Sequence, residues 1–401
     1  MPKPRMVKIE PKVLLWARQS MNINREMAVE HFRKSKTRRK HNIDMKRLKE
    51  IESHQGRIEI SFSLFQDFSH FYKRPLAVFF LAKPIDDKFV PKDFRTLLSK
   101  ARYELSPKTM LIIRRARRTQ EFISDIADKI NFDTKFKYKK YDLSHNVAKL
   151  AGYFRKEFSF YFEQQKKIKD DQQLFNFLRS KLESAGVLVL RHSFPLDDAR
   201  AFSIVDKSPF IIVLNNKDGD DTLFSPKIFS LMHEFCHILL RESTINSDYL
   251  NNYIKTEKFC NEFAGEFLIP QEFFKEELGS IIKAPNKFNK NEIDDYIKIL
   301  KKIFNVSGHA ILRKILNLGF INNQFYKNKV DEWEEKYKGK KRFIRGTTPE
   351  KKTLNSCGKL FSGIVLSAES ANIITYSQAA NMLGLKEKYM SQFKEVFIGN
   401  I

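Results

Sequence analysis

The segment Leu-Met-His-Glu-Phe-Cys-His at residues 231–237 constrains this chain more than any other feature. Residues four apart on an α-helix lie one above the other, so His233 and His237 can direct two imidazoles at one point, with Glu234 beside them. Histidines in this spacing are typical zinc ligands, and the glutamate between them is placed to act as a general base. The alternative is that all three are ordinary helix residues.

A carboxylate follows at a spacing found in catalytic zinc sites. Nineteen residues separate His237 from Glu257, as in thermolysin-type enzymes, whose third ligand comes from a second helix. Two histidines and one carboxylate leave the fourth tetrahedral position open, which a catalytic zinc needs. We therefore expect one Zn2+ held by the two histidines and Glu257. Glu262 and Glu266 are fallback ligands, but Glu262 lies about 140° around the helix from Glu257.

The residues before the histidine motif predict a small sheet. Three short apolar or β-branched runs, at 187–190, 201–205 and 210–214, are separated by Pro, Asp and Asn. Runs of this length between turn-forming residues are typical of strands. We expect these three strands to pack against the helix that carries the motif.

Two helices are predicted around the candidate ligands. An apolar-rich stretch over 224–240 predicts the motif helix, with Ser225 as its N-cap and Pro226 as its first residue. Thr256 is placed to cap the helix that carries Glu257. The strands and these two helices make a minimal zincin-like core.

A wider pattern joins these segments. It consists of Ile-Val-Leu-Asn at 212–215, His-Glu-x-x-His-Ile-Leu-Leu at 233–240, and Glu-x-x-Cys-Asn-x-Phe-Ala-x-x-x-Leu-Ile-Pro at 257–270. The pattern resembles the ImmA/IrrE family of metallo-endopeptidases, most strongly over residues 180–275. The resemblance implies a zinc-dependent peptidase whose substrate is a partner protein, since family members of this type cleave or antagonise a repressor.

The cysteines distinguish this chain from the usual family pattern. The family usually has Leu-Gly where this chain has Phe235-Cys236, and Ala where it has Cys260, so packing and oxidation sensitivity beside the ligands are in question while the ligands stay. With Cys357 there are three cysteines, which imply no disulfide framework. We expect a reduced, cytoplasmic protein.

The resemblance extends beyond the peptidase segment. The stretch from Tyr72 to Leu81, with Asp-Phe-Arg at 93–95, resembles the exit from an XRE-like helix-turn-helix domain, which precedes the peptidase in longer members of the family. The tail from Gly358 to Tyr389 resembles their C-terminal helical segment. The match between about 100 and 180 is weak.

The expected fold class is α+β and mostly helical. We expect an XRE-like helix-turn-helix bundle over 1–95 and a helical connector over 96–180. A zincin-like peptidase domain with a small sheet and a helical extension follows over 181–340, and a C-terminal helical segment completes the chain over 341–401.

The N-terminal segment is strongly basic. The chain has a formal net charge of +25, and its first fifty residues hold fifteen Lys or Arg against five Asp or Glu. Apolar residues at helical spacing predict helices over 25–34 and 43–53, the second of which would enter the DNA major groove. The candidate DNA contacts are Arg33, Lys34, Arg38, Arg39, Lys40, Lys46 and Arg47. The long basic connection over 35–42 leaves two alternatives, which are binding to phosphates alone and a merely solvated basic surface.

Several function classes are disfavoured. The longest apolar runs are too short to span a bilayer, and no signal-peptide core follows the N-terminus, so we expect no membrane partner. A Gly-rich phosphate loop and a Cys-x-x-Cys pair are both missing from the sequence, which argues against nucleotide-driven chemistry. His309 is either a second catalytic group or an ordinary histidine.

The leading hypothesis is a zinc endopeptidase that cleaves a partner protein, by resemblance a repressor, and that binds DNA through its N-terminal domain. One alternative is a DNA-binding regulator whose zincin domain acts as a sensor or docking module with little turnover. Another is a component of a toxin-antitoxin or defence system.

Overall fold

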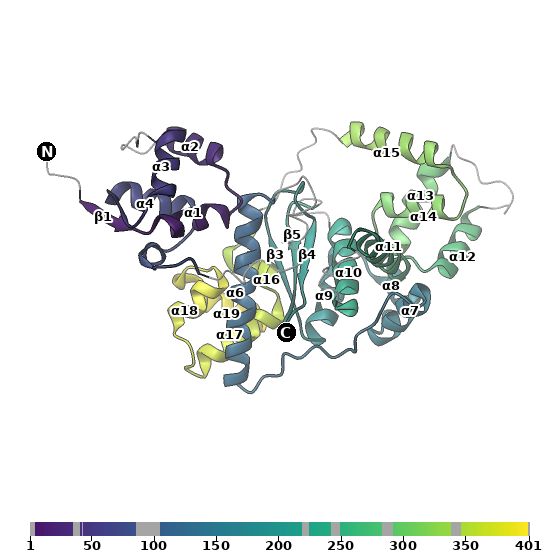
Figure 1. Cartoon of the computed structure of the whole chain (residues 1–401). Coiled ribbons are helices and arrows are strands. Elements are labelled where there is room, and N and C mark those ends of the chain that lie inside the picture. The colour runs from purple at the N-terminus through teal and green to yellow at the C-terminus, as the bar shows by residue number, and fades with distance from the viewer. Residues whose placement is uncertain are drawn as a thin grey trace. The chain divides into compact units, whose positions relative to one another are not determined.

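The computed structural model describes residues 5–34, 41, 43–85, 105–218, 224–241, 249–282, 292–337 and 346–399. The chain divides into two compact units, Met1–Arg117 and Arg118–Ile401. Helices dominate both units, and each unit has a small sheet within its described residues (Figure 1). The expected α+β, mostly helical fold class is therefore confirmed.

The first unit combines helices with one antiparallel pair of strands. Met6 lies opposite Ser61 and Ile9 opposite Ile58 in this pair. The sequence analysis did not anticipate the two strands. The elements of the first unit, in chain order, are β1 (Met6–Ile9), α1 (Pro11–Gln19), α2 (Arg25–Lys34), α3 (Met45–Ser53), β2 (Ile58–Ser61), α4 (Phe62–Phe71), the 3-10 helix η1 (Leu76–Phe80) and the start of α6 (Pro107–Lys129).

A buried ion-pair network fixes the helices of the first unit. The Arg18 guanidinium donates to both carboxylate oxygens of Glu52, at 2.5 and 3.0 Å, and Arg25 donates to the same carboxylate at 2.8 Å. The side chain of Glu52 is 1% exposed. A buried carboxylate needs such partners, because removing one would leave an uncompensated charge. The network joins α1, α2 and α3.

The sheet of the second unit has three strands in the order β3-β5-β4. Strand β3 (Val187–His192) runs parallel to the central strand β5 (Phe210–Asn215), and β4 (Ala201–Ile204) pairs antiparallel with β5 (Figure 1). All six residues of β5 are buried, as expected for a strand covered on both faces. The three predicted strands are confirmed.

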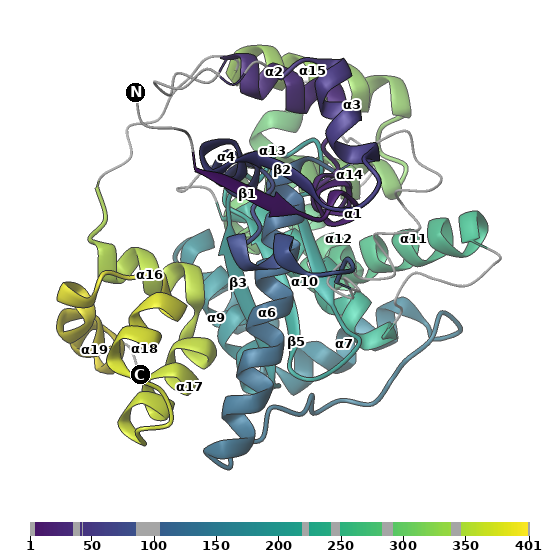
Figure 2. The same cartoon turned by 60° about the vertical axis from the view of Figure 1, so that its left-hand side comes forward.

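Helices make up the rest of the second unit. After the C-terminal part of α6, they are α7 (Val147–Glu157), α8 (Phe162–Lys167), α9 (Asp171–Ser184), α10 (Ser225–Leu240), α11 (Tyr249–Leu268), α12 (Gln271–Ile281), α13 (Ile293–Phe304), α14 (Gly308–Asn317), α15 (Asn323–Tyr337), α16 (Pro349–Cys357), α17 (Lys359–Ser370), α18 (Tyr376–Leu383), the 3-10 helix η3 (Glu387–Tyr389) and α19 (Met390–Ile398). Helices α16 to α19 form one group, in which α16 packs on β3 and α17 on α9 (Figure 2).

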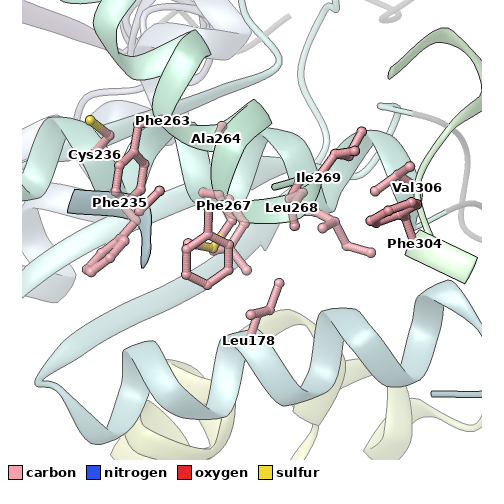
Figure 3. Packing of buried hydrophobic residues seen from close by; sticks show 14 of the residues in the cluster. Leu178, Phe235, Cys236, Phe263, Ala264, Phe267, Leu268, Ile269, Phe304 and Val306 are labelled. Carbon is pink, nitrogen blue, oxygen red and sulfur yellow. The ribbon is translucent and has the colours of Figure 1, made fainter. Parts of the chain in front are cut away.

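An aromatic core surrounds the motif helix α10. Leu178 of α9, Phe235 of α10, and Phe263 and Phe267 of α11 are fully buried and close together (Figure 3). The rings of Phe235 and Phe263 have centroids 6.2 Å apart, and those of Phe263 and Phe267 are 6.1 Å apart. Close packing of large rings leaves α10 and α11 little freedom to shift relative to each other.

The start of α10 differs from the predicted one. Phe224 is the N-cap, and Ser225 is already helical. Asp171 of α9 supplies the capping acceptor, because its Oδ2 accepts hydrogen bonds from Phe224 N at 3.0 Å, Ser225 N at 2.9 Å and Ser225 Oγ at 2.7 Å. The predicted N-cap role of Ser225 is wrong because a carboxylate from another helix satisfies the free N–H groups.

The predicted N-cap role of Thr256 is also wrong. Helix α11 begins at Tyr249, so Thr256 lies inside it and is 1% exposed. The backbone N–H groups that a cap would serve are already within a helix that began two turns earlier.

Gly358 lies where the start of α17 contacts α9. The buried carboxylate of Glu183 pairs with Arg179 at 3.0 Å and accepts from Lys359 N at 3.0 Å and Leu360 N at 3.2 Å, at the start of α17. Gly358 has φ +80° and ψ 171°, a conformation that side-chain-bearing residues rarely adopt. A Cβ at this position would lie 2.0 Å from Glu183 Oε1, so only glycine fits.

Candidate metal centre

Helix α10 carries both candidate histidines on one face. His233 and His237 are separated by one turn, and their side chains are 15% and 12% exposed. The rest of the helix is almost wholly buried against the sheet, α9 and α11. The two imidazoles therefore project from a rigid support, as the spacing predicts.

Helix α11 brings Glu257 to these imidazoles. The two Nε2 atoms lie 3.1 Å apart. Glu257 places Oε2 3.4 Å from Nε2 of His233 and Oε1 3.2 Å from Nε2 of His237. These three residues form a group whose potential ligand atoms all lie within 4.8 Å of one another.

The donor set fits a tetrahedral metal ion. Zinc binds imidazole nitrogen and carboxylate oxygen at about 2.0–2.2 Å, so two ligand atoms on a tetrahedral ion lie roughly 3.3 Å apart. The observed separations are 3.1 to 3.4 Å. The fallback ligands are occupied elsewhere, since Glu266 pairs with Lys314 at 2.6 Å and Glu262 lies 3.9 Å from Lys258.

The charges of the cluster are strongly coupled. Burial alone lowers the pKa of His237, but hydrogen bonds with Cys260 and Glu257 outweigh it, and the pKa lies well above its usual value near 6.5. Burial alone raises the pKa of Glu257, whereas hydrogen bonds from His233 and His237 bring it down to about 2. Without a metal the cluster is an internal ion pair, and a metal that binds it must displace a proton.

Two residues to which the sequence analysis gave no such role lie against the histidines. Asn261 places Oδ1 3.1 Å from Nδ1 of His233, which leaves Nε2 of that ring free to face the metal position. The thiol of Cys260 is close enough to His237 to contribute to the raised pKa of that ring. Both lie three or four residues after Glu257, on the same face of α11, so the helical period was the signal that could have found them.

Glu234, the predicted general base, is buried beside the cluster. It follows His233 on α10 and is 8% exposed. Its charge is close enough to contribute to the raised pKa of His237. A carboxylate in this place can accept a proton from a water that approaches the metal position.

A cavity of about 1910 Å³ opens beside Glu257 and Asn261. Its wall continues along α7, the start of α12, and α14, where it includes His309. The His309 ring packs edge-to-face on Trp333, with centroids 5.0 Å apart. His309 therefore shares a cavity with one candidate ligand while also packing against α15.

The predicted DNA contacts lie in the first unit. Arg33 and Lys34 are exposed at the end of α2, and Lys46 and Arg47 are exposed on α3. Lys34 pairs with Glu30, and Arg47 lies 3.3 Å from Glu50. Arg38, Arg39 and Lys40 lie outside the described residues. Binding of DNA through these residues stays a prediction.

In the described residues, no helix has both the length and the apolar character needed to cross a membrane.

Comparison with known proteins identifies the segment that holds the cluster. Residues 182–315 match the family model described as IrrE N-terminal-like domain, Peptidase_M78. The searches of curated proteins and of solved structures gave no match. The matched segment contains the three strands, α10 with its two histidines and α11 with Glu257. Residues 182–315 are therefore similar to the peptidase domain of the ImmA/IrrE family, and this match does not extend to the rest of the chain.

Proposed function

We propose that the protein is a zinc-dependent endopeptidase with His233, His237 and Glu257 as metal ligands. The observation that carries this proposal is the convergence of two imidazole nitrogens and the Glu257 carboxylate, whose separations of 3.1 to 3.4 Å suit one tetrahedral ion. A His/His/Glu set supplies three ligands and leaves one position open, which a catalytic metal requires and a structural metal does not. The match of residues 182–315 to a metallopeptidase family model supports the same reaction class.

When bound, zinc would supply Lewis-acid chemistry and make an attacking water more acidic. Glu234 acts as the general base, taking the proton from that water and delivering it to the leaving amine. Asn261 orients the His233 ring through its Nδ1. The cavity beside Glu257 gives a polypeptide segment room to reach these groups.

The substrate in this proposal is a partner protein, by family resemblance a transcriptional repressor. In the same proposal, the basic helices α2 and α3 bind DNA. Arg33 and Lys34 on α2, and Lys46 and Arg47 on α3, are exposed to solvent and could contact it. Cleavage of a repressor by a protein that also binds DNA would relieve repression near the site of binding.

The test is elemental analysis of the purified chain together with a cleavage assay on the partner repressor. We expect about one zinc per chain, and loss of both zinc and cleavage in the double variant His233→Ala/His237→Ala. Full zinc occupancy in that variant would contradict the ligand assignment. A chain that binds zinc and its partner without cleaving it would instead favour a sensor or docking role.

DNA binding is tested separately on the full chain. Neutralising Arg38, Arg39 and Lys40 should weaken binding to every duplex and reduce the log-log salt slope by up to about three units, because phosphate contacts are sequence-blind. Changing Lys46 and Arg47 to alanine should reduce discrimination between sequences. Absence of binding at low salt would remove DNA from the proposal.

A further inference from the structure

The cavity beside Glu257 has an unequal distribution of charge. Its wall holds eight Lys or Arg side chains and five Asp or Glu side chains. Counting alone does not separate charges that are already neutralised from charges that a ligand could meet. The ion pairs of the wall show which of these charges already have a partner of opposite sign.

Three basic side chains of the wall are paired within it. Lys314 lies 2.6 Å from Glu266, Arg200 lies 2.7 Å from Asp218, and Lys258 lies 3.9 Å from Glu262. A fourth, Arg155, is buried and donates to the carbonyl oxygen of Phe267 and to Gln165. Glu257 belongs to the metal-ligand group. These residues already have partners within the protein, so we do not count them as charges that are free to meet a ligand.

Four basic side chains remain, against one carboxylate. Lys149 and Lys156 come from α7, Lys275 from α12 and Arg313 from α14, and all four are exposed. Within the part of the chain that the structure describes, none of them pairs with a carboxylate. Arg313 lies over the ring of Tyr326, 4.4 Å from its centroid. The remaining carboxylate of the wall is Glu272, so the free charge of the cavity is positive.

Large apolar side chains line the same cavity. Ile254, one turn before Glu257 on α11, is 57% exposed, and Tyr161 is 54% exposed. Phe229, one turn before His233 on α10, also lines it. Exposed apolar groups of this size beside a candidate active site indicate subsites for apolar side chains of a ligand.

We propose that the cavity binds a substrate segment that carries both acidic and large apolar side chains. This inference rests on the proposed peptidase function and names its substrate class. The volume of about 1910 Å³ exceeds the roughly 300–1,000 Å³ of small-molecule sites, so a chain segment fits better. The free cations at Lys149, Lys275 and Arg313 receive the carboxylates, and Phe229 and Ile254 receive the apolar groups.

A nucleic acid fits this cavity less well than an acidic peptide. Single-stranded nucleic acid uses grooves of continuous positive charge that follow its phosphates. Here the free cations come from three separate helices and are divided by neutral ion pairs and by apolar side chains. Separate carboxylates on a peptide can meet separate cations, whereas a regular phosphate chain cannot avoid the interruptions.

The test measures binding without turnover, on the full Glu234→Gln chain loaded with zinc. Three fluorescein-labelled twelve-residue peptides are compared by anisotropy, with the repeats Ala-Glu-Leu-Gly, Ala-Gln-Leu-Gly and Ala-Lys-Leu-Gly. At low salt we expect the Glu peptide to bind at least tenfold more tightly than the Gln peptide, and the Lys peptide to bind most weakly. Equal binding of the three peptides, or binding of none, overturns the inference.

A charge-matched pair of variants locates the preference. The triple variant Lys149→Gln/Lys275→Gln/Arg313→Gln changes exposed cavity residues, and Lys298→Gln/Lys301→Gln/Lys302→Gln removes the same charge from exposed positions of α13 outside the cavity. The preference for Glu over Gln should fall below about threefold in the first and stay in the second. An equal loss in both, or tighter binding of an oligothymidine of equal charge at the same residues, contradicts the inference. Because binding is read without cleavage, failure of the proposed peptidase activity would appear separately, in the wild-type cleavage assay.

Discussion

Two carboxylates of the second unit meet similar neighbours with opposite results. Glu257 faces two imidazoles, and Glu183 faces a guanidinium and two backbone N–H groups. Burial favours the neutral acid at both positions. At Glu257 the histidines outweigh it and the pKa falls to about 2, whereas at Glu183 burial dominates and the pKa is raised.

The difference lies in where the donors point. Around Glu183, Nε of Arg179 and the N–H groups of Lys359 and Leu360 all donate to the carboxylate itself, and these bonds hold α17 against α9. Around Glu257 three donor atoms converge on a shared point between them, where an ion can bind. The charges around Glu183 are neutralised by one another, whereas the three residues around Glu257 could also hold an ion.

The largest effect is expected at Glu234. Glu234→Gln removes the base and leaves the three ligands in place, so zinc content and fold should persist while kcat/KM for peptide cleavage falls about a thousandfold or more. Cleavage kinetics and elemental analysis on the same preparation check this. Undiminished cleavage would show that another group accepts the proton.

The next largest effect is expected at Gly358, beside the carboxylate of Glu183. Gly358→Ala places a methyl group 2.0 Å from Glu183 Oε1 at a backbone conformation reserved for glycine. We expect a loss of about 3 kcal/mol or more in the free energy of unfolding, measured by urea denaturation, with zinc binding retained.

Gly363→Ala is the control for that variant. It lies inside α17, the helix that Gly358 precedes, and a Cβ there would meet Phe397 at the ordinary distance of 3.4 Å. Because alanine is the better helix former, it should change stability little or raise it by up to about 1 kcal/mol. A similar loss in both variants would rule out the Glu183 contact as the cause.

Replacing Asn261 should have a moderate effect, and it should change the metal affinity alone. Asn261→Ala removes the acceptor of His233 Nδ1, and such losses typically weaken metal affinity by about 10–100-fold. Competition with a chelator of known affinity measures it. Asn261→Asp keeps an acceptor and should retain most of the affinity, so equal weakening in both variants would contradict a positioning role.

The smallest expected effect is the dependence of zinc affinity on pH. The pKa of His237 is raised, so the ring is still partly protonated above pH 6.5, and zinc must displace that proton. Affinity should fall as the pH decreases, by about tenfold per unit for each displaced proton, beginning above pH 6.5. Cys260→Ala removes a hydrogen bond that raises this pKa and should move the onset to lower pH. An unchanged onset would exclude Cys260 as a cause.

Short-range patterns predicted where the three candidate ligands and the strands of the second unit lie. The helical period placed His233 above His237, alternation and turn residues located β3, β4 and β5, and the spacing to Glu257 brought the third donor into reach. Each of these inferences needs only the geometry of one helix or strand, or a resemblance between motifs. Local geometry is what a single sequence specifies most directly.

Contacts between distant segments were not predictable in this way. Asp171 caps α10 from 53 residues away, and Glu183 meets Lys359 across 176 residues. The cavity wall combines α7, α11, α12 and α14, whose meeting depends on packing of the whole unit. The β1–β2 pair was missed because four-residue strands between helices carry too little pattern to separate from loops.

The capping of α10 by Asp171 has a consequence for the order in which the chain assembles. Polypeptides are synthesised from the N-terminus, so α9 and its carboxylate already exist when Phe224 and Ser225 emerge. Helix α11, with Glu257, follows soon after, whereas the N–H donors of Lys359 and Leu360 are made much later. The ligand set can therefore form on a growing chain, and a nascent polypeptide that stops before Gly358 would already hold both histidines and Glu257 while the carboxylate of Glu183 still waited for its last two donors.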